Sequence, residues 1–394
     1  MLTGVSQLAA RAETALLERN PLYERFFACE AERLAAACRE MSDRFLHGGR
    51  LLAFGRGACA TDAQHVSVEF VHPVIVGKRA LPALDLSIQF RPWLAALVQP
   101  NDIAMGFGPP AGDPVVECAL KFAGSRGAMT FALPGQCASY GFQPATNHPF
   151  LHQEITEILY HTLWETVHVF FERNQLGHDA GEAAFLYPFL GGEQQSAAGV
   201  MEEVAASIRM KVEDDARLRA RMAAEESEAI AAAVMVMRAR LNRGGKLILF
   251  GNGGSATDAN DWALDCFMPP PGYRPVPAIS LSLEPANITA LANDVGPEVV
   301  FLRQLIAHAQ PEDVAIGIST SGGSRNIVMA LEEARKRELL TIGLLGYDGG
   351  EIARRGLADH ALVVRSDYIP RIQEVQASVY HTIRELLEDP DAQA

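Results

Sequence analysis

Apolar residues run without a break over 247–250 and over 51–54, and each run passes directly into a glycine-rich turn. Such short apolar runs, bounded by turn residues, are typical of strands buried on both faces of a parallel sheet. After each turn the apolar residues recur at helical spacing, as they do over 61–70. The pattern therefore predicts a buried strand, a tight turn and a helix at both places.

The same reading extends along the rest of the chain. Further strands are predicted at 80–86, 103–107 and 128–133, and further helices at 1–47, 114–122, 152–171 and 199–240. The second half then repeats the order strand, turn, helix, strand, helix, strand, helix. Strands that alternate with helices predict an α/β fold, in which helices cover both faces of a parallel sheet and sites form at the carboxyl ends of the strands.

Three sequence matches, found in the same order in both halves, predict two copies of one domain. They pair 51–63 with 247–259, 102–106 with 313–317, and 153–161 with 373–381. The first pair shares the ending Ala-Thr-Asp-Ala. Self-similarity of this kind marks a repeat. We therefore expect domains at 1–172 and 199–394, joined by a linker at 173–198 that its aromatic residues partly hold down.

Composition sets limits on location and partners. The chain has 394 residues, of which 48% are hydrophobic and 21% charged, a balance typical of globular proteins. No stretch reads as a membrane span or signal peptide, so a cytoplasmic location is expected, without membrane partners. A net charge of −14 argues against nucleic acid as a partner. The six cysteines show no CxxC spacing and are expected to be reduced and mostly buried.

Two turns of the second copy carry the residue types that bind anions. The first is Gly251-Asn-Gly-Gly-Ser255, and the second is Ile318-Ser-Thr-Ser-Gly-Gly-Ser324. Glycines let backbone N–H groups approach a ligand, and a helix N-terminus favours negative charge. A glycine-rich turn of this kind can also be no more than a tight connection. The first copy has Phe107-Gly-Pro-Pro-Ala-Gly112 at the second position, and its prolines offer neither hydroxyl nor N–H.

The first copy instead carries a set of metal-ligating and acid–base residue types. His65 and Glu69 are four residues apart on a predicted helix and so share one face. Gln153 and His161 are eight apart on another, roughly on one face. In the second copy, the positions of His65 and Glu69 hold Asp261 and Asp265.

Together, the two hydroxyl-rich turns, Asn293-Asp294, and Gln373 with His381 resemble the sugar isomerase (SIS) domain, and more narrowly the phosphoheptose isomerase family. The resemblance covers nearly all of 200–390 and, in eroded form, nearly all of 1–172. It implies two tandem SIS domains, each a flavodoxin-like, doubly wound parallel sheet flanked by helices. It also implies an enzyme that converts a sugar phosphate, sedoheptulose 7-phosphate, to a heptose 7-phosphate.

The resemblance further implies roles for individual residues. The substrate and its phosphate would be held by the second copy, through Asn252, Gly253, Gly254, Ser255, Asp294, Ser319, Thr320, Ser321, Ser324, Gln373 and His381. A metal, zinc at about one ion per chain, would be held by His65, Glu69, Gln153 and His161. Glu69 and His161 would double as the catalytic acid–base pair. Asp261 and Asp265 depart from the family pattern.

Because the two copies are complementary, we expect hybrid sites and a homo-oligomer, a dimer of two-domain chains that mimics an SIS tetramer. Aldose–ketose interconversion needs a base, an acid and stabilisation of charge on the carbonyl oxygen, which a carboxylate, an imidazole and zinc supply. Two alternatives stay open. The histidines can be ordinary interfacial side chains in a decayed copy. The whole chain can be a non-catalytic SIS protein that senses sugar phosphates or binds a partner protein.

Overall fold

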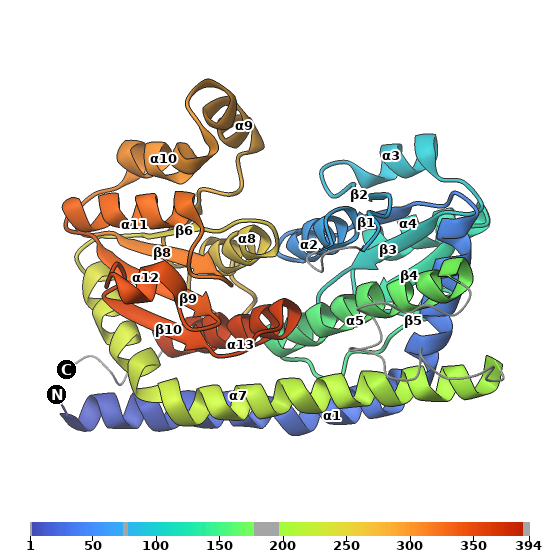
Figure 1. Cartoon of the computed structure of the whole chain (residues 1–394), viewed down its shortest axis with the longest axis horizontal. Helices are drawn as coiled ribbons and strands as arrows, with labels where there is room; N and C mark the ends of the chain where they lie inside the picture. The colour runs from blue at the N-terminus through green and yellow to red at the C-terminus, as the bar shows by residue number, and fades with distance from the viewer. Residues whose placement is uncertain (1, 74–77, 137, 177–196, 389–394) are drawn as a thin grey trace. The chain divides into compact units, whose positions relative to one another are not determined.

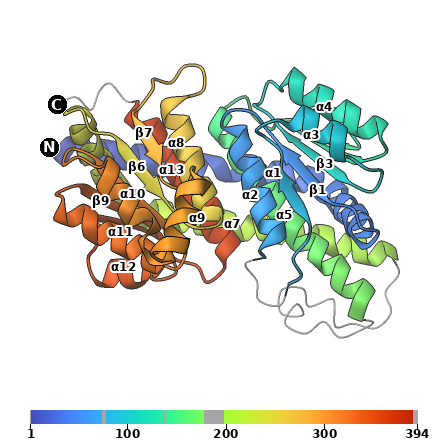
Figure 2. The same cartoon turned by 90° about the horizontal axis from the view of Figure 1, so that it is seen from above.

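The protein is described by a computed structural model that covers residues 2–73, 78–136, 138–176 and 197–388. Contacts divide the chain into two compact units. One comprises Pro21–Asp214 and is called the first-repeat unit here. The other comprises Met1–Asn20 together with Asp215–Ala394 and is called the second-repeat unit. Figures 1 and 2 show the elements of each. The predicted linker at 173–198 lies largely outside the described residues.

The first-repeat unit alternates strands and helices, as its sequence predicts. Its elements are the second part of α1 (Leu2–Leu46), β1 (Leu51–Phe54), α2 (Cys59–Val71), β2 (Ala83–Asp85), α3 (Phe90–Leu97), β3 (Ile103–Phe107), α4 (Pro114–Ser125), β4 (Met129–Leu133), β5 (Tyr140–Gly141), α5 (Pro149–Leu176) and the start of α7 (Ala197–Leu241). The short elements α3 and β5 were not predicted, because eight and two residues carry too little periodicity.

The second-repeat unit follows the same plan with additions. After α7 it contains β6 (Leu247–Phe250), α8 (Gly254–Phe267), β7 (Ala278–Ser280), α9 (Pro285–Asp294), the 3-10 helix η2 (Pro297–Val299), α10 (Val300–His308), β8 (Val314–Ser319), α11 (Arg325–Lys336), β9 (Leu340–Gly346), α12 (Gly350–Arg354), β10 (His360–Val364) and α13 (Ile369–Leu387). Helices α9 and α10 fall where α3 alone stands in the first repeat, which explains the extra residues around Asn293.

Both units contain a five-stranded sheet with one topology. The orders are β2-β1-β3-β4-β5 and β7-β6-β8-β9-β10, and every pairing is parallel. Leu51 pairs with Ile103 in one sheet, and Leu247 pairs with Val314 in the other. The predicted fold class, a flavodoxin-like α/β sheet present twice, is confirmed.

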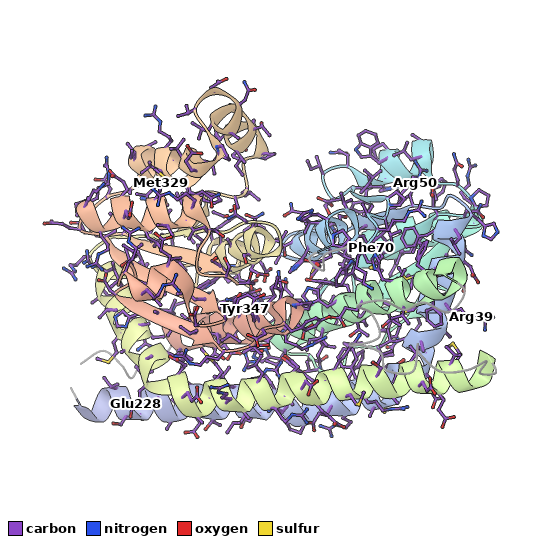
Figure 3. All side chains as sticks on the ribbon, viewed as in Figure 1. Arg39, Arg50, Phe70, Glu228, Met329 and Tyr347 are labelled. Carbon is purple, nitrogen blue, oxygen red and sulfur yellow. The ribbon has the colours of Figure 1, made fainter. Side chains whose placement is uncertain are left out.

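The unbroken apolar runs are explained by cores on both faces of each sheet. In the first-repeat unit, Leu51 and Ala53 pack with α2 and α5, whereas Leu52 and Phe54 pack with α3 and α4. Figure 2 shows these two pairs of helices on opposite sides of the strands, and Figure 3 labels Phe70 of α2, which is fully buried. Every residue of β1 therefore contacts a core, which is why no polar residue interrupts it.

The repeated aspartate before the third strand of each unit fixes the start of the central strands. Asp102 accepts hydrogen bonds from the backbone N–H and guanidinium of Arg50, at 3.0 Å and 2.8 Å. In the second-repeat unit, Asp313 holds Lys246 in the same way, at 2.8 Å and 2.6 Å. The match between 102–106 and 313–317 thus has a structural cause.

The two long helices α1 and α7 each contribute to both units. Leu8 and Leu16 of α1 belong to the core of the second-repeat unit, whereas Phe27 and Leu34 belong to that of the first. The boundaries drawn by contacts, at 20/21 and 214/215, therefore fall inside these helices. Within the described chain, no helix combines the length and apolar character needed to cross a membrane. The thiols are less buried than predicted, since Cys29 and Cys118 are exposed.

Candidate active site

Helices α2 and α5 of the first-repeat unit bring three of the predicted metal ligands together. His65 and Glu69 lie one turn apart on the face of α2 that packs against α5, and His161 lies on the facing side of α5. All three are at most 2% exposed. Leaving polar groups at this depth is costly unless they bind one another or an ion.

The geometry of this first-repeat cluster fits a cation. The Nε2 atoms of His65 and His161 are 3.3 Å apart, and His65 Nε2 is 3.8 Å from Glu69 Oε1. Ligand atoms of the three residues all lie within 4.8 Å of one another. Glu69 Oε2 is buried without a hydrogen-bond partner among the described residues. Two imidazole nitrogens and a carboxylate, one oxygen of which is unsatisfied, form a donor set that suits zinc.

The fourth predicted ligand, Gln153, lies on α5 eight residues before His161 and is half-buried. Its neighbour His152, which sequence reasoning did not single out, is buried, and its Nε2 lies 3.2 Å from the carbonyl oxygen of Gly108. Burial lowers the pKa of His152 to about 4, so the neutral ring donates to that carbonyl. His152 therefore anchors the proline-containing turn after β3.

The environment of Glu69 changes its titration. Burial, followed by the negative charge of Glu165, raises the pKa of Glu69 to about 8. Glu165 lies one turn beyond His161 on α5 and pairs with Lys211 of α7 at 2.5 Å. Neither Glu165 nor Lys211 was predicted, because a single buried ion pair between distant helices leaves no sequence motif. A carboxyl with a pKa near neutrality has the titration range of a general base.

The second-repeat unit has a counterpart cluster on α8 and α13. His381 Nε2 lies 3.5 Å from Asp261 Oδ2 and 3.3 Å from Asp265 Oδ2. The hydroxyl of Tyr380 donates to Asp261 at 2.8 Å. Burial and the charge of Asp261 raise the pKa of Asp265, while His381 opposes the shift. This second-repeat cluster offers one nitrogen and two carboxylates, a harder donor set than the first.

The two anion-binding turns of the second-repeat unit are linked by side chains. After β6, Gly253 has a φ of 57°, and a Cβ at Gly251 would lie 2.2 Å from the carbonyl oxygen of Ser255. The tight turn therefore requires glycine at both positions. Asn252 exchanges two hydrogen bonds with Asn326 of α11, at 3.0 Å and 2.8 Å. The turn after β6 is thus fixed against the helix that follows the second turn.

The hydroxyl groups of the second turn gather at the N-terminus of α11. Ser319 Oγ lies 3.4 Å from Ser324 Oγ and accepts from the backbone N–H of Gly322 at 3.1 Å. Ser321 is exposed and accepts from Gly323 at 3.2 Å. Ser324 is the N-cap residue of α11, yet its side chain makes no capping hydrogen bond. The amide of Ile327 in the first turn donates to the Asn326 side chain at 3.0 Å, and the Ser324 hydroxyl stays available to another partner.

The remaining predicted ligand residues lie in different surroundings. Thr320 is half-buried in the same turn, and Ser255 is buried at the start of α8. Asp294 is exposed at the end of α9, where it accepts from Asn293 at 2.7 Å. Gln373 is buried on α13 with His381. The structure thus groups the hydroxyls in one place and His381 with the aspartates in another.

The corresponding turn of the first-repeat unit has a structural role. Asp113 occupies the position of Ser324 and caps α4 by accepting from the backbone N–H of Val115 at 2.8 Å. Arg56, at the position of Asn252, pairs with Asp113 at 3.1 Å. A carboxylate here repels phosphate and occupies the helix N-terminus, in agreement with the predicted loss of phosphate binding.

The comparisons with known proteins agree with this fold. Residues 212–346 match the family described as SIS domain. Phosphoheptose isomerase of Solidesulfovibrio magneticus is 41% identical over 182 residues, which are 46% of this chain and 88% of that protein. The enzyme of the same name from Thermodesulfovibrio yellowstonii is 38% identical over 188 residues, 48% of this chain and 92% of that protein.

Solved structures extend the likeness of fold to both repeats. The C-terminal domain of glucosamine-fructose-6-phosphate aminotransferase from Francisella tularensis matches 95% of this chain and 96% of its own, with a TM-score of 0.57 at 8% identity. Tagatose-6-phosphate ketose/aldose isomerase from Escherichia coli matches 97% of this chain and 96% of its own, with a TM-score of 0.56 at 13% identity.

The repeated sheet and the hydroxyl-rich turns define an SIS-domain protein. With relatives at about 40% identity that are covered almost in full, the chain belongs to the phosphoheptose isomerase family, a family of sugar-phosphate isomerases. The predicted resemblance is confirmed. The roles assigned to individual site residues stay predictions.

Proposed function

We propose that this chain catalyses aldose–ketose isomerisation of a sugar phosphate, with sedoheptulose 7-phosphate as the substrate to test first. The observation that carries the proposal is the buried His65, Glu69 and His161 cluster, whose residue types supply an acid, a base and metal ligands in one place. The similarity to phosphoheptose isomerases supports the choice of substrate class.

Glu69 and His161 divide the proton transfers in this proposal. Isomerisation moves a proton between adjacent carbons through an enediol. Glu69, once ionised, accepts the proton from carbon, since its raised pKa of about 8 makes it a stronger base than an ordinary carboxylate. His161 exchanges a proton with the carbonyl oxygen. Zinc, held by His65, Glu69, His161 and Gln153, would supply Lewis-acid polarisation of that carbonyl.

The phosphate of the substrate would be held by the hydroxyl-rich turns of the second repeat. Ser319 and Ser324 hydroxyls lie 3.4 Å apart, and Ser324, the N-cap residue of α11, makes no capping hydrogen bond through its side chain. Binding energy from a phosphate remote from the reacting carbons fixes the orientation of the substrate. Asn252, whose amide bonds Asn326, keeps the two turns in register.

The proposal therefore assigns chemistry to one repeat and phosphate binding to the other, so that a complete site needs both. The residues support it: the first repeat has the acid–base cluster and a capped, proline-containing turn, and the second has the hydroxyls. A homodimer of two-domain chains is the assembly we propose, with the second repeat drawn from either the same chain or its partner.

One observation favours the second candidate, a non-catalytic SIS protein that senses sugar phosphates or binds a partner protein. In the repeat that keeps the phosphate turns, His381 is already within 3.5 Å of two carboxylates. A protonated His381 would offset one of the two carboxylate charges without a metal, and a proton on Asp265, whose pKa is raised, would offset the other and leave the cluster inert. Under this candidate, sugar phosphates bind but are not converted.

The two candidates are separated by assaying the purified full chain, loaded with zinc, on sedoheptulose 7-phosphate and shorter ketose phosphates. Proton exchange at the carbon next to the carbonyl, followed by NMR in deuterated water, reports enediol formation even when little product accumulates. Incorporation of deuterium supports the isomerase. Saturable binding without any exchange would favour the sensor.

A further inference from the structure

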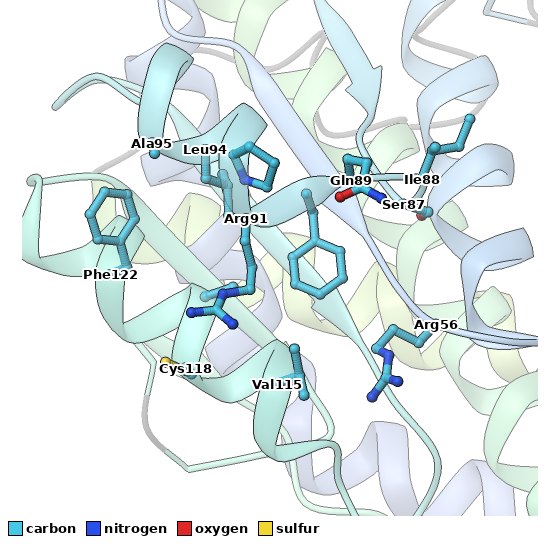
Figure 4. Close-up of a pocket in the computed structure, with 13 residues that line it drawn as sticks. Arg56, Ser87, Ile88, Gln89, Arg91, Leu94, Ala95, Val115, Cys118 and Phe122 are labelled. Atoms are coloured by element: carbon cyan, nitrogen blue, oxygen red, sulfur yellow. The ribbon is translucent and has the colours of Figure 1, made fainter.

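A cavity of about 780 Å³ lies in the first-repeat unit, away from the residues discussed so far. Its walls come from α3, from α4 and from the turns that follow β1 and β2 (Figure 4). Helices α3 and α4 cover the face of the sheet opposite α2 and α5. The cavity is therefore separate from the His65, Glu69 and His161 cluster, and the isomerase proposal leaves it without a use.

The charged side chains that line this cavity in the described chain are two arginines, Arg56 and Arg91. Figure 4 shows both side chains extending toward α4, on either side of Val115. Arg56 is held in place by Asp113, whose Oδ1 also caps α4. Arg91 is exposed at the start of α3. Two guanidinium groups on one cavity provide the planar donors that bind phosphate.

The N-terminus of α3 adds to this positive character. The described first turn of α3 contains no acidic residue, and its N-cap residue Gln89 makes no capping hydrogen bond through its side chain. Ser87 and Gln89, both polar, line the cavity at this end. Uncapped amides at a helix start favour a negatively charged ligand.

The remaining wall is apolar, and two of its large side chains are exposed. Ile88 is 89% exposed and Phe122 is 38% exposed, and both line the cavity. Large apolar side chains left open beside cations favour a ligand that is anionic at one end and flat or apolar at the other.

We propose that this cavity binds a nucleoside monophosphate, with its phosphate on Arg91 and the α3 N-terminus, its base against Phe122, and Arg56 contributing only the guanidinium nitrogens that do not bond Asp113. Any nucleobase can stack on an aromatic side chain, whether or not its edge forms hydrogen bonds with the protein. The second repeat has Asn252 in place of Arg56, with that asparagine bound to Asn326. The first repeat would thus have exchanged the phosphate turn of an SIS domain for a different anion site.

Cys118 provides a direct readout, because it is exposed and lines the cavity, whereas the equally exposed Cys29 lies on α1 outside it. Alkylation of the full chain is followed by mass spectrometry with AMP, GMP, CMP or UMP, inorganic phosphate or sedoheptulose 7-phosphate present. We expect at least one nucleotide, at about 1 mM or below, to slow alkylation of Cys118 and leave Cys29 unchanged.

Variants then test the arginines. Arg91→Gln removes an exposed cation and should weaken nucleotide binding about tenfold, measured by calorimetry, the scale of one charge-assisted hydrogen bond. Lys121→Gln, an equal change of charge on α4 at a residue outside the cavity lining, is the matched control and should change nothing. Phe122→Ser should weaken nucleotides and leave any binding of inorganic phosphate intact.

Three results would overturn the proposal. They are the absence of protection by all four nucleotides, equal protection by inorganic phosphate or the sugar phosphate, and nucleotide binding that Arg91→Gln and Lys121→Gln weaken to the same extent. Because nucleotide binding is scored without turnover, these outcomes are independent of whether the chain is an isomerase.

Discussion

The two buried clusters on α2 with α5 and on α8 with α13 occupy matching positions in two copies of one fold, yet they hold different donors. The first repeat presents His65, Glu69 and His161, and the second presents Asp261, Asp265 and His381. In the first cluster two imidazole nitrogens face each other at 3.3 Å. In the second cluster the one imidazole faces two carboxylates, at 3.3 Å and 3.5 Å.

This difference changes what each cluster needs. Two lone pairs and a carboxylate oxygen without a partner call for a cation from outside the chain. In the second cluster, the imidazole can take up a proton and form ion pairs with the carboxylates beside it. The same backbone thus presents a nitrogen-rich donor set in one repeat and a carboxylate-rich donor set in the other, because the identities of two residues on one helix differ.

The largest expected effect concerns zinc. His65→Ala should lower zinc affinity by about 100-fold or more, because it removes a direct ligand. Even the loss of a residue that only hydrogen-bonds to a ligand lowers metal affinity by about tenfold or more. Asp261→Ala, the matching change in the second repeat, should leave zinc content at about one ion per chain. Metal analysis of both variants after dialysis makes the measurement. Two zinc ions per wild-type chain would contradict the prediction that only the first-repeat cluster binds zinc.

A smaller effect is expected for the phosphate turns. Ser319→Ala or Ser321→Ala should each weaken sugar-phosphate binding by about 1–2 kcal/mol, the scale of a hydrogen bond to a charged group. Pro110→Ser in the first repeat should have no effect, because Asp113 already occupies the helix N-terminus beside it. Calorimetric titration of the three full-length variants compares the repeats. Equal losses in both would contradict the assignment.

Zinc affinity should also depend on pH through Glu69. Its pKa is raised to about 8, so below that pH a proton competes with the metal, and affinity should rise by up to about tenfold per pH unit toward pH 8. Above that value the dependence should flatten. Glu69→Gln should remove this dependence above the usual range of histidine titration. An unchanged slope in that variant would assign the proton to another group.

The smallest effect is on stability and contrasts the two turns. Asp113→Ala should lower the free energy of unfolding by about 1 kcal/mol, because it removes the cap of α4. Its exposed pair with Arg56 should add little. Ser324→Ala should cost less, since its side chain does not cap α11. Urea unfolding of both variants measures the difference, and a larger loss for Ser324→Ala would show a structural role there.

The sequence predicted most of the fold because apolar runs buried on both faces are unambiguous. The runs at 51–54 and 247–250 became β1 and β6 with the expected bounds, and the repeat predicted the shared sheet order. Helix α3 escaped prediction, since two of its eight residues, Phe90 and Leu94, are buried. The sequence also did not predict that α1 and α7 are each shared between the two units. The apolar periodicity of each helix continues across the boundary and so does not reveal it.

The site was predictable where residues lie close in sequence on one helix, as His65 and Glu69 do. The site could not be predicted where the partners of a residue come from distant helices. The pair of Glu165 with Lys211, which influences Glu69, and the bond from His152 to Gly108 depend on packing between helices. The cavity beside Arg91 was not predicted either, because its lining residues come from separate segments that share no sequence motif.

The most direct test of the central claim compares turnover of Glu69→Gln and Asp265→Asn on sedoheptulose 7-phosphate. Both changes replace a buried carboxylate by its amide at matching positions, so the shape is kept while the charge and the acid–base function are lost; zinc is kept in excess so that weaker metal binding does not decide the result. The account predicts that Glu69→Gln lowers turnover by about 100-fold or more, the scale of a positioned general base, with substrate binding nearly intact, and that Asp265→Asn does much less. Loss of turnover in Asp265→Asn with activity retained in Glu69→Gln would locate the chemistry in the second repeat and contradict it.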